Sequence, residues 1–109
     1  MSIERLLGSA SRLRDDANEL GTMLVEEGSV DCVYNPLDYA WDIHERYIQI
    51  SGGRGAKTVM LGMNPGPHGM GQMGIPFAAT SMVRAFLGIC NIPVKQPSTA
   101  HPKRPVIGL

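Results

Sequence analysis

Residues 58–77, TVMLGMNPGPHGMGQMGIPF, decide the expected fold. The stretch opens on a short apolar run, residues 58–62, which ends in a glycine. A run of this length with such a boundary is typical of a buried parallel strand. Two prolines and four glycines then follow within residues 63–74, a density that no regular element is expected to hold. The sequence therefore predicts a shaped loop at the carboxyl end of a strand, where ligands bind in open α/β sheets.

The rest of the chain reads as helices joined by irregular segments. Apolar residues recur at three- and four-residue steps from Ile3 onward, and Gly28 is a plausible stop. A second helix is expected after the Asn35-Pro36 turn, with Ala40, Ile43, Tyr47 and Ile50 along one face. A third begins after a cap at Thr80 or Ser81 and ends before Gly88. The expected helices are residues 3–27, 38–50 and 82–87, with extended segments at 30–34 and 91–109.

Composition indicates one small globular domain spanning residues 1–109. The apolar fraction is 43% and the charged fraction 18%, which argues against a disordered chain. Ten basic and ten acidic residues give a net charge of zero, so a whole-chain basic signature for nucleic acid is absent. No apolar run is long enough to span a membrane. Cys32 and Cys90 match no metal spacing, which favours a reducing, intracellular setting.

Two glycine-rich patterns invite a nucleotide interpretation. Residues 69–74, GMGQMG, match the dinucleotide fingerprint in letters. That fingerprint needs its first glycine at the strand end, whereas residues 63–67 intervene and Pro76 follows. A phosphate-binding loop at residues 55–58 is excluded because this segment precedes the strand and lacks the required spacing.

Asn64 is the residue of chemical interest in the loop. Its side-chain amide offers both a donor and an acceptor, and Pro65 and Pro67 restrict the backbone around it. Gly66 allows a ligand to approach the main chain, and Phe77 supplies a flat apolar face. These features suit a flat heterocycle with amide-like edges, such as a nucleobase. An ordinary turn with Phe77 in the core is an equal alternative.

A resemblance extends this interpretation. Residues 62–70, GMNPGPHGM, are similar to the first active-site motif of the single-strand-selective monofunctional uracil-DNA glycosylases, and the match continues through residue 77. The similarity covers roughly residues 30–109. Further matching segments are Tyr34-Asn35-Pro36, Tyr39-Ala40-Trp41, Ser81-Met82-Val83-Arg84, His101-Pro102-Lys103-Arg104-Pro105-Val106 and Gly108-Leu109.

The resemblance implies an α/β fold, a three-layer parallel sheet with helices on both faces. It implies a DNA-repair hydrolase that removes uracil and 5-hydroxymethyluracil from single- and double-stranded DNA without a metal or other cofactor. The target nucleotide would be flipped into a pocket. The partner would be uracil-containing DNA, with no membrane involved. The expected location is the cytoplasm, at the nucleoid, in a bacterium and the nucleus in a eukaryote.

The same resemblance assigns roles within the motif. Asn64 would be catalytic, orienting the attacking water through its amide oxygen. The Met63 main chain would bond the base edge, Gly66 would leave room for a 5-substituent, and Phe77 would stack on the uracil. Pro65 completes the expected substrate-binding set by fixing the backbone beside Asn64.

Five further residues are candidates for DNA contact. Lys103 and Arg104 could meet phosphates, although a solvated loop is nearly as good an explanation. His68 stands where the family often has an aromatic residue, with an exposed loop residue as the equal alternative. Pro67 and Met70 complete the candidates, and Met70 also suits a pocket wall or the core.

Two family elements have no counterpart within residues 1–109. One is a later asparagine that reads the uracil edge, and the other is a histidine in a His-Pro-Ser motif that stabilises the departing anion. We therefore expect the chain to be the N-terminal portion of the glycosylase fold, with the C-terminal half as a possible partner. The alternative is a catalytically incompetent DNA-binding remnant or half-domain.

Overall fold

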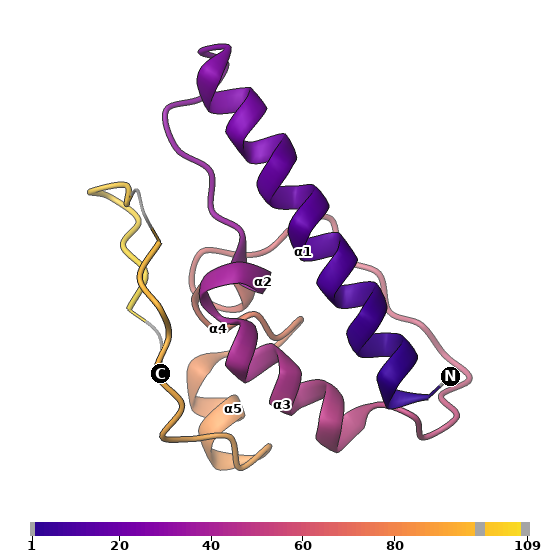
Figure 1. The fold of residues 1–109 in the computed structure, drawn as a ribbon. Helices are drawn as coiled ribbons and strands as arrows, with labels where there is room; N and C mark the ends of the chain where they lie inside the picture. Colours follow the sequence, from indigo (N-terminus) through magenta and orange to yellow (C-terminus); the bar gives the residue numbers. More distant parts are fainter. Residues whose placement is uncertain (1, 98–99, 108–109) are drawn as a thin grey trace.

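The computed structural model describes residues 2–97 and 100–107, in which helices are joined by long irregular segments (Figure 1). The longest helix runs diagonally along one side of the molecule, and the shorter ones gather beside its N-terminal half. The helices are α1 (Ile3–Glu26), α2 (Pro36–Tyr39), α3 (Trp41–Ser51), α4 (Met70–Met73) and α5 (Thr80–Ala85).

Helix α1 confirms the helix predicted at residues 3–27. The Ser2 hydroxyl caps its start by accepting a hydrogen bond from the Arg5 N–H at 3.2 Å. At its end Gly28 takes a left-handed conformation, with φ of 82°. The Ser29 N–H then donates to the Leu24 carbonyl at 3.1 Å, which satisfies a carbonyl that the helix leaves free.

The helix predicted at residues 38–50 is found as two helices. Asn35 caps α2 by accepting a hydrogen bond from the Leu37 N–H at 3.2 Å. Ala40 then leaves the helical region, with φ of −107° and ψ of 24°, and separates α2 from α3. The Asn35 amide also donates to the Arg14 carbonyl and to Asn18 Oδ1, both at 2.9 Å, and so ties α2 to α1.

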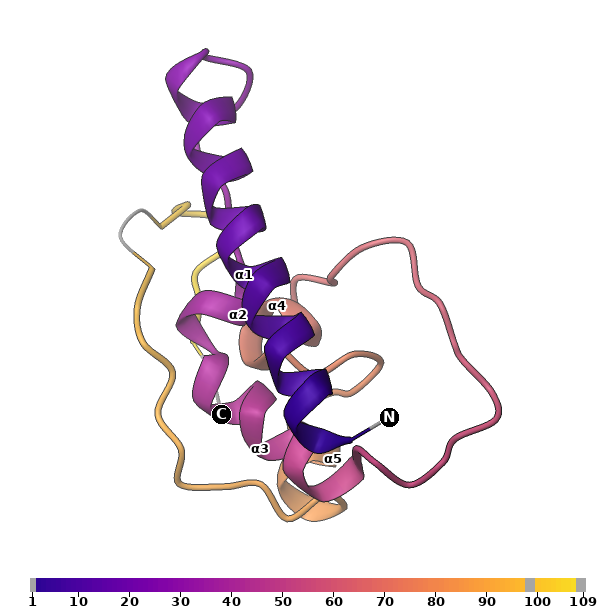
Figure 2. The ribbon, with the colours of Figure 1, turned by 45° about the vertical axis from the view of Figure 1, so that its right-hand side comes forward.

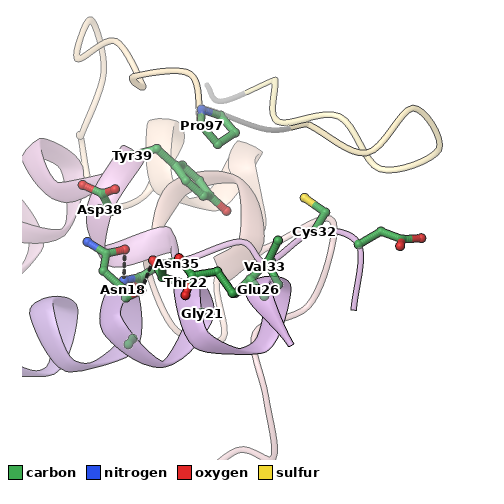
Figure 3. Close-up of a pocket in the computed structure, with 13 residues that line it drawn as sticks. Asn18, Gly21, Thr22, Glu26, Cys32, Val33, Asn35, Asp38, Tyr39 and Pro97 are labelled. Atoms are coloured by element: carbon green, nitrogen blue, oxygen red, sulfur yellow. Dashed lines mark hydrogen bonds between the residues drawn. The ribbon is translucent and has the colours of Figure 1, made fainter. Parts of the chain in front are cut away.

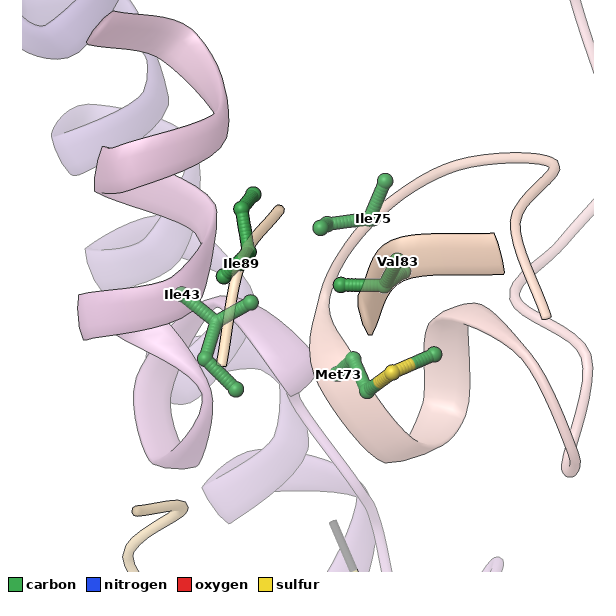
Figure 4. Close-up of a cluster of buried hydrophobic side chains, with 5 residues drawn as sticks. All are labelled: Ile43, Met73, Ile75, Val83 and Ile89. Atoms are coloured by element: carbon green, nitrogen blue, oxygen red, sulfur yellow. The ribbon is translucent and has the colours of Figure 1, made fainter. Parts of the chain in front are cut away.

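The main core lies between α3 and the segments that follow the motif loop (Figure 4). Ile43 from α3 points toward side chains from α4, α5 and their connecting segments. The predicted apolar face of α3 is confirmed, because Ala40 and Ile43 are buried and Tyr47 and Ile50 pack against the cluster. The cluster consists of Ile43, Met73, Ile75, Val83 and Ile89.

The predicted three-layer parallel sheet is wrong. Residues 2–97 and 100–107 contain no β-strand. Residues 58–62 are irregular, and Val59 and Leu61 are 88% and 93% exposed, whereas a strand of a parallel sheet is buried on both faces. The apolar run and its glycine boundary are local features, but a strand also needs a neighbouring chain with which to exchange hydrogen bonds. Within the described residues, no segment pairs with this run.

Two smaller expectations also need correction. The glycine-rich loop was expected to hold no regular element, yet α4 forms one helical turn there. Gly74 makes this possible, since its φ of 74° ends the turn and its N–H bonds to the Met70 carbonyl at 2.8 Å. Helix α5 begins after Ala79 without a side-chain cap, so neither Thr80 nor Ser81 plays the predicted capping role.

The segment after α5 runs back past α2 without helical structure, as predicted for residues 91–107 (Figure 2). The Lys95 N–H donates to the Tyr39 carbonyl at 2.8 Å, and Val106 is buried against Tyr39 and Ala40. Gly108 and Leu109, which belong to the last motif segment, lie outside the described residues. Across the described ranges, no helix is both long and apolar enough to cross a membrane.

Candidate functional site

The loop that carries Asn64 is exposed to solvent. The segment between α3 and α4 swings out in a wide arc away from the helices (Figure 2). Met63 is 99% exposed, and Asn64, Pro65 and Gly66 are also exposed. Among the described residues no group hydrogen-bonds to the Asn64 side chain, so its amide is available to a ligand or a water molecule.

Phe77 lies beside the chain just before Asn64. A Cβ added at Gly62 would come within 3.2 Å of the Phe77 ring, so the ring and the start of the loop approach closely. Phe77 is 66% exposed, which makes the alternative of a core Phe77 wrong. Its φ of 58° is unusual for a residue with a large side chain. The structure thus presents an exposed aromatic face beside Gly62, which lies two residues before Asn64 in the chain.

The base of the loop is held by Tyr39 from α2. Its hydroxyl donates a short hydrogen bond to the Gly71 carbonyl. Burial, with a smaller contribution from Tyr34, raises the pKa of Tyr39 to about 12. The phenol therefore stays protonated near neutral pH and remains a donor to Gly71.

His44 from α3 holds the same loop one helical turn further on. Its Nδ1 lies 2.6 Å from the Gly74 carbonyl, and because a carbonyl can only accept, Nδ1 carries the proton. His44 is 9% exposed. Burial lowers the pKa of His44, while the bond to Gly74 acts in the opposite direction. The imidazole is therefore a neutral structural donor at this position.

The buried His44 predicts acid-sensitive stability. As pH falls, the unfolded chain binds a proton at this residue before the folded chain does, because burial lowers the pKa of His44 in the fold. Its neutral form contributes fully above the ordinary histidine pKa of 6.5, and stability is lost as pH falls below it. The variant His44→Asn keeps a donor toward Gly74 but does not titrate. We expect it to reduce the slope of the unfolding free energy against pH by an amount that corresponds to at most one proton per molecule.

Thermal melts of both proteins from pH 7.5 to pH 5 measure the effect. The difference between the two melting temperatures at each pH reports His44 alone, because the carboxylates are the same in both proteins. The matched control is Gln49→Asn, at an exposed position of α3 that does not titrate, which should keep the acid sensitivity of the wild type. Parallel melting curves for wild type and His44→Asn would contradict the assignment.

The five candidate DNA contacts fall in two places. Pro67 and His68 are exposed on the loop, and Met70 is half-buried at the start of α4. Lys103 and Arg104 are exposed on a turn after Pro102. This turn is closed by the Arg104 N–H, which donates to the His101 carbonyl at 3.1 Å. The His101 N–H donates in turn to the Tyr34 hydroxyl at 2.6 Å, which fixes the turn to the segment before α2.

The cavity shown in Figure 3 lies apart from the predicted site. It has a volume of about 370 Å³ and lies between α1 and residues 31–39. Asn18 and Asn35 are hydrogen-bonded to one another in its wall. None of the predicted site residues lines it. In the described part of the chain, no group of three or more His, Cys, Asp or Glu side chains is placed to hold a metal ion.

Sequence reasoning missed the residues that support the loop. None of Tyr39, His44 and Gln72 was predicted to support the loop, although all three hydrogen-bond to backbone carbonyls of the motif segment. A signal existed for His44, since it stands four residues after the buried Ala40 and three before Tyr47. Polar residues at such core-facing helical positions need a partner, so a structural bond could have been expected.

The chain is similar to known proteins along much of its length. No protein-family model matches the chain. The chain is 42% identical over 106 residues, 97% of its length, to a bovine protein named single-strand selective monofunctional uracil DNA glycosylase. Mouse and rat proteins described in the same terms are each 48% identical over 80 residues, 73% of this chain.

These matches make the chain a homologue of DNA glycosylases. More particularly, its relatives are named single-strand selective monofunctional uracil-DNA glycosylases, the family that the motif at residues 62–77 indicated; the match covers nearly all of this chain for the bovine protein and about three quarters of it for the other two. The chain spans 37% of the length of the bovine relative and 28% of the mouse and rat relatives.

Proposed function

We propose that the protein containing this chain is a monofunctional uracil-DNA glycosylase in base excision repair. It would remove uracil and 5-hydroxymethyluracil from single- and double-stranded DNA. The identity of 42% to a relative of that name over 97% of the chain carries this proposal. The exposed Asn64 amide and the exposed Phe77 support it, because both are available to a base that leaves the DNA stack. Such a protein would act at the nucleoid of a bacterium or in the nucleus of a eukaryote.

The proposed reaction begins with flipping of the target nucleotide, which costs a few kcal/mol and less for an unpaired base. The uracil ring would stack on Phe77 while the main chain at Met63 bonds its edge. Gly66, which carries no side chain, would leave room beside C5. Pro65 would keep the backbone at Asn64 in one conformation.

The chemical step is hydrolysis of the N-glycosidic bond. The bond from C1′ to the uracil nitrogen breaks with its electron pair going to uracil, and a water molecule attacks the oxocarbenium-like sugar. The hydroxyl of that water remains on C1′ and its proton is released, so that uracil leaves and an abasic sugar remains. Asn64 would align the water through its amide oxygen, since an amide is too weak a base to take the proton. Pro67, His68, Met70, Lys103 and Arg104 would lie along the DNA.

The test is excision from a labelled single-stranded oligonucleotide with one uracil, followed by alkali to cleave the abasic product. A matched oligonucleotide with thymine at that position is the control. Cleavage of the uracil strand alone is expected. If the protein shows no cleavage at any concentration, the proposed activity is contradicted.

A second candidate is a half-domain that binds DNA without chemistry. The exposed Asn64 amide and Phe77 ring support it, because both can contact a base without any chemistry. The same oligonucleotide distinguishes the two, because binding measured by fluorescence anisotropy without any cleavage identifies the half-domain. Binding together with cleavage identifies the glycosylase.

Replacing Phe77 with alanine should weaken excision of uracil. Loss of base stacking is worth ~1–3 kcal/mol, which corresponds to a decrease of roughly 5- to 150-fold. Alanine keeps a Cβ, so the strained φ of 58° is not relieved and folding should change little. The measurement is the single-turnover rate constant of excision.

Phe86→Ala is the matched control for this change. Phe86 follows α5 and is 78% exposed, so it offers an equally accessible aromatic ring outside the motif. Its replacement should leave the rate constant within about twofold of the wild-type value. Equal losses for the two variants would mean that Phe77 has no specific contact with the base.

A further inference from the structure

Gln72 connects two segments of the chain that lie far apart in the sequence. Its Nε2 donates to the Pro67 carbonyl at 2.9 Å and to the Pro105 carbonyl at 3.0 Å. Its Oε1 accepts from the Ile107 N–H at 2.6 Å. One side-chain amide thus uses its donors and its acceptor to join the motif loop to the C-terminal segment.

On one side this amide fixes the loop that carries Asn64. Pro67 lies three residues after Asn64, and both belong to the exposed part of the loop. The backbone reinforces the connection, because the Gly71 N–H donates to the Gly66 carbonyl at 2.7 Å. The two sides of the loop are so close there that a Cβ on Gly71 would come within 2.5 Å of that carbonyl. The Gln72 side chain therefore closes the loop just beyond Asn64.

On the other side the amide fixes the basic turn, residues 101–104, which carries Lys103 and Arg104. Pro105 follows Arg104 directly, and the turn itself is held to Tyr34 through the His101 N–H. Without the bonds from Gln72, the chain after Arg104 would be held chiefly by the burial of Val106 and by the bond from the Gln96 side chain to its carbonyl, at 3.3 Å. Gln72 thus sets the position of the turn relative to the loop.

We propose that Gln72 is a positioning residue for uracil excision, and this rests on the proposed glycosylase function. Gln72 does not touch the reacting atoms. It acts through Pro67, which keeps Asn64 in place, and through Pro105, which keeps Lys103 and Arg104 at a fixed separation from the loop. DNA held by the basic turn would then present its flipped base to Asn64 in one register.

We call the hydrogen bonds that join Gln72 to Pro67, Pro105 and Ile107 the Gln72 clamp. Loss of this clamp should slow the chemical step. A displacement of about 1 Å of a positioning group can reduce a rate by ~100-fold. Gln72 affects Asn64 only indirectly, through Pro67, and the backbone bond between Gly71 and Gly66 remains. We therefore expect a smaller decrease in the rate, of at least about tenfold. The variant for this test is Gln72→Met, which has a similar volume and no hydrogen-bonding group of comparable strength.

The experiment measures single-turnover excision by the purified protein, with rate constant and amplitude recorded separately. A purely structural role would lower the amplitude, which reports the folded fraction, and leave the rate constant unchanged. We expect Gln72→Met to lower the rate constant at least about tenfold with the amplitude preserved. The matched control, Gln49→Met at an exposed position of α3, should retain the wild-type rate constant.

Gln72→Glu provides a conservative variant with its own signature. At neutral pH its carboxylate can still accept from the Ile107 N–H but cannot donate to the Pro67 and Pro105 carbonyls. At pH 5 a protonated fraction regains one donor. The rate of Gln72→Glu relative to wild type should therefore rise from pH 7.5 to pH 5, while that of Gln72→Met stays constant. Flat ratios for both variants, or a wild-type rate constant in Gln72→Met, would overturn the proposal.

Amide hydrogen exchange separates this proposal from the glycosylase function itself. Exchange of the Ile107 amide should accelerate in Gln72→Met, because its acceptor is lost, and this needs no activity. A wild-type protein that excises no uracil would overturn the glycosylase function and the role of Gln72 in it. An active wild type with equal Ile107 exchange in both proteins would overturn the clamp alone.

Discussion

Asn64→Ala is expected to lower the single-turnover rate of uracil excision by at least ~100-fold while DNA binding stays nearly unchanged. Alignment of the attacking water is a positioning effect, and such effects can supply several kcal/mol of a barrier. Asn64 is exposed, and within the described residues its side chain makes no hydrogen bond to a protein group. Its removal should therefore leave the stability of the fold unchanged. The measurements are excision by alkaline cleavage and binding by fluorescence anisotropy on the same oligonucleotide.

Two variants sharpen this test. Gln49→Ala removes an exposed side-chain amide from α3, away from the motif, and should excise uracil at the wild-type rate. Asn64→Asp keeps an oxygen for the water but loses the amide donor, so it should retain more activity than Asn64→Ala. A parallel loss of binding and excision in Asn64→Ala, or a lower melting temperature, would show that Asn64 is structural rather than catalytic.

Helices were the part of the fold that the sequence predicted well. The extent of α1 and the buried face of α3 follow from apolar residues at three- and four-residue steps, and this signal is local. The apolar stripe of α1 is not buried throughout, because Leu13 and Leu20 are 59% and 56% exposed. The break at Ala40 was missed because alanine is the best helix former and no proline or glycine marks the position. In the structure Asn35 caps a separate turn that begins at Pro36, and Ala40 lies outside the helical region.

The predicted sheet failed because strand pairing is not a local property. Residues 58–62 have the composition of a buried strand, yet their side chains are exposed and no described segment pairs with them. Composition reports what a segment tolerates, whereas hydrogen-bonded partners are set by segments far along the chain. The exposure of Val59 and Leu61 is the direct measure of that missing partner.

The site shows the same division between local and distant information. The motif at residues 62–77 was enough to predict roles for Asn64 and Phe77, because a specific order of residue types is local. The bonds that hold this loop join residues 32 apart for Tyr39 and Gly71 and 30 apart for His44 and Gly74. No spacing rule connects such pairs, so the support of the loop became visible only in three dimensions.

The core beneath the motif loop gives the largest expected change in stability, through Ile43→Ala. Ile43 is 0% exposed and packs with Met73 and Ile75, which flank the Gly74 anchored by His44. Replacing a buried isoleucine with alanine costs about 2–5 kcal/mol, a large share of the 5–15 kcal/mol typical of a domain. At ~4–8 °C per kcal/mol for a domain of this size, the melting temperature should fall by ~8 °C or more.

The comparison that decides this prediction is with Leu13→Ala on α1. Leu13 is 59% exposed, so removal of its side chain should change stability by no more than about 0.5 kcal/mol. We also expect lost excision in Ile43→Ala to follow the folded fraction, so that the single-turnover amplitude recovers on cooling while the rate constant stays at the wild-type value. Equal melting temperatures for the two variants would mean that Ile43 does not anchor the core. A rate constant that stays low in fully folded Ile43→Ala would instead mean that the core sets the geometry of the Asn64 loop as well as its stability.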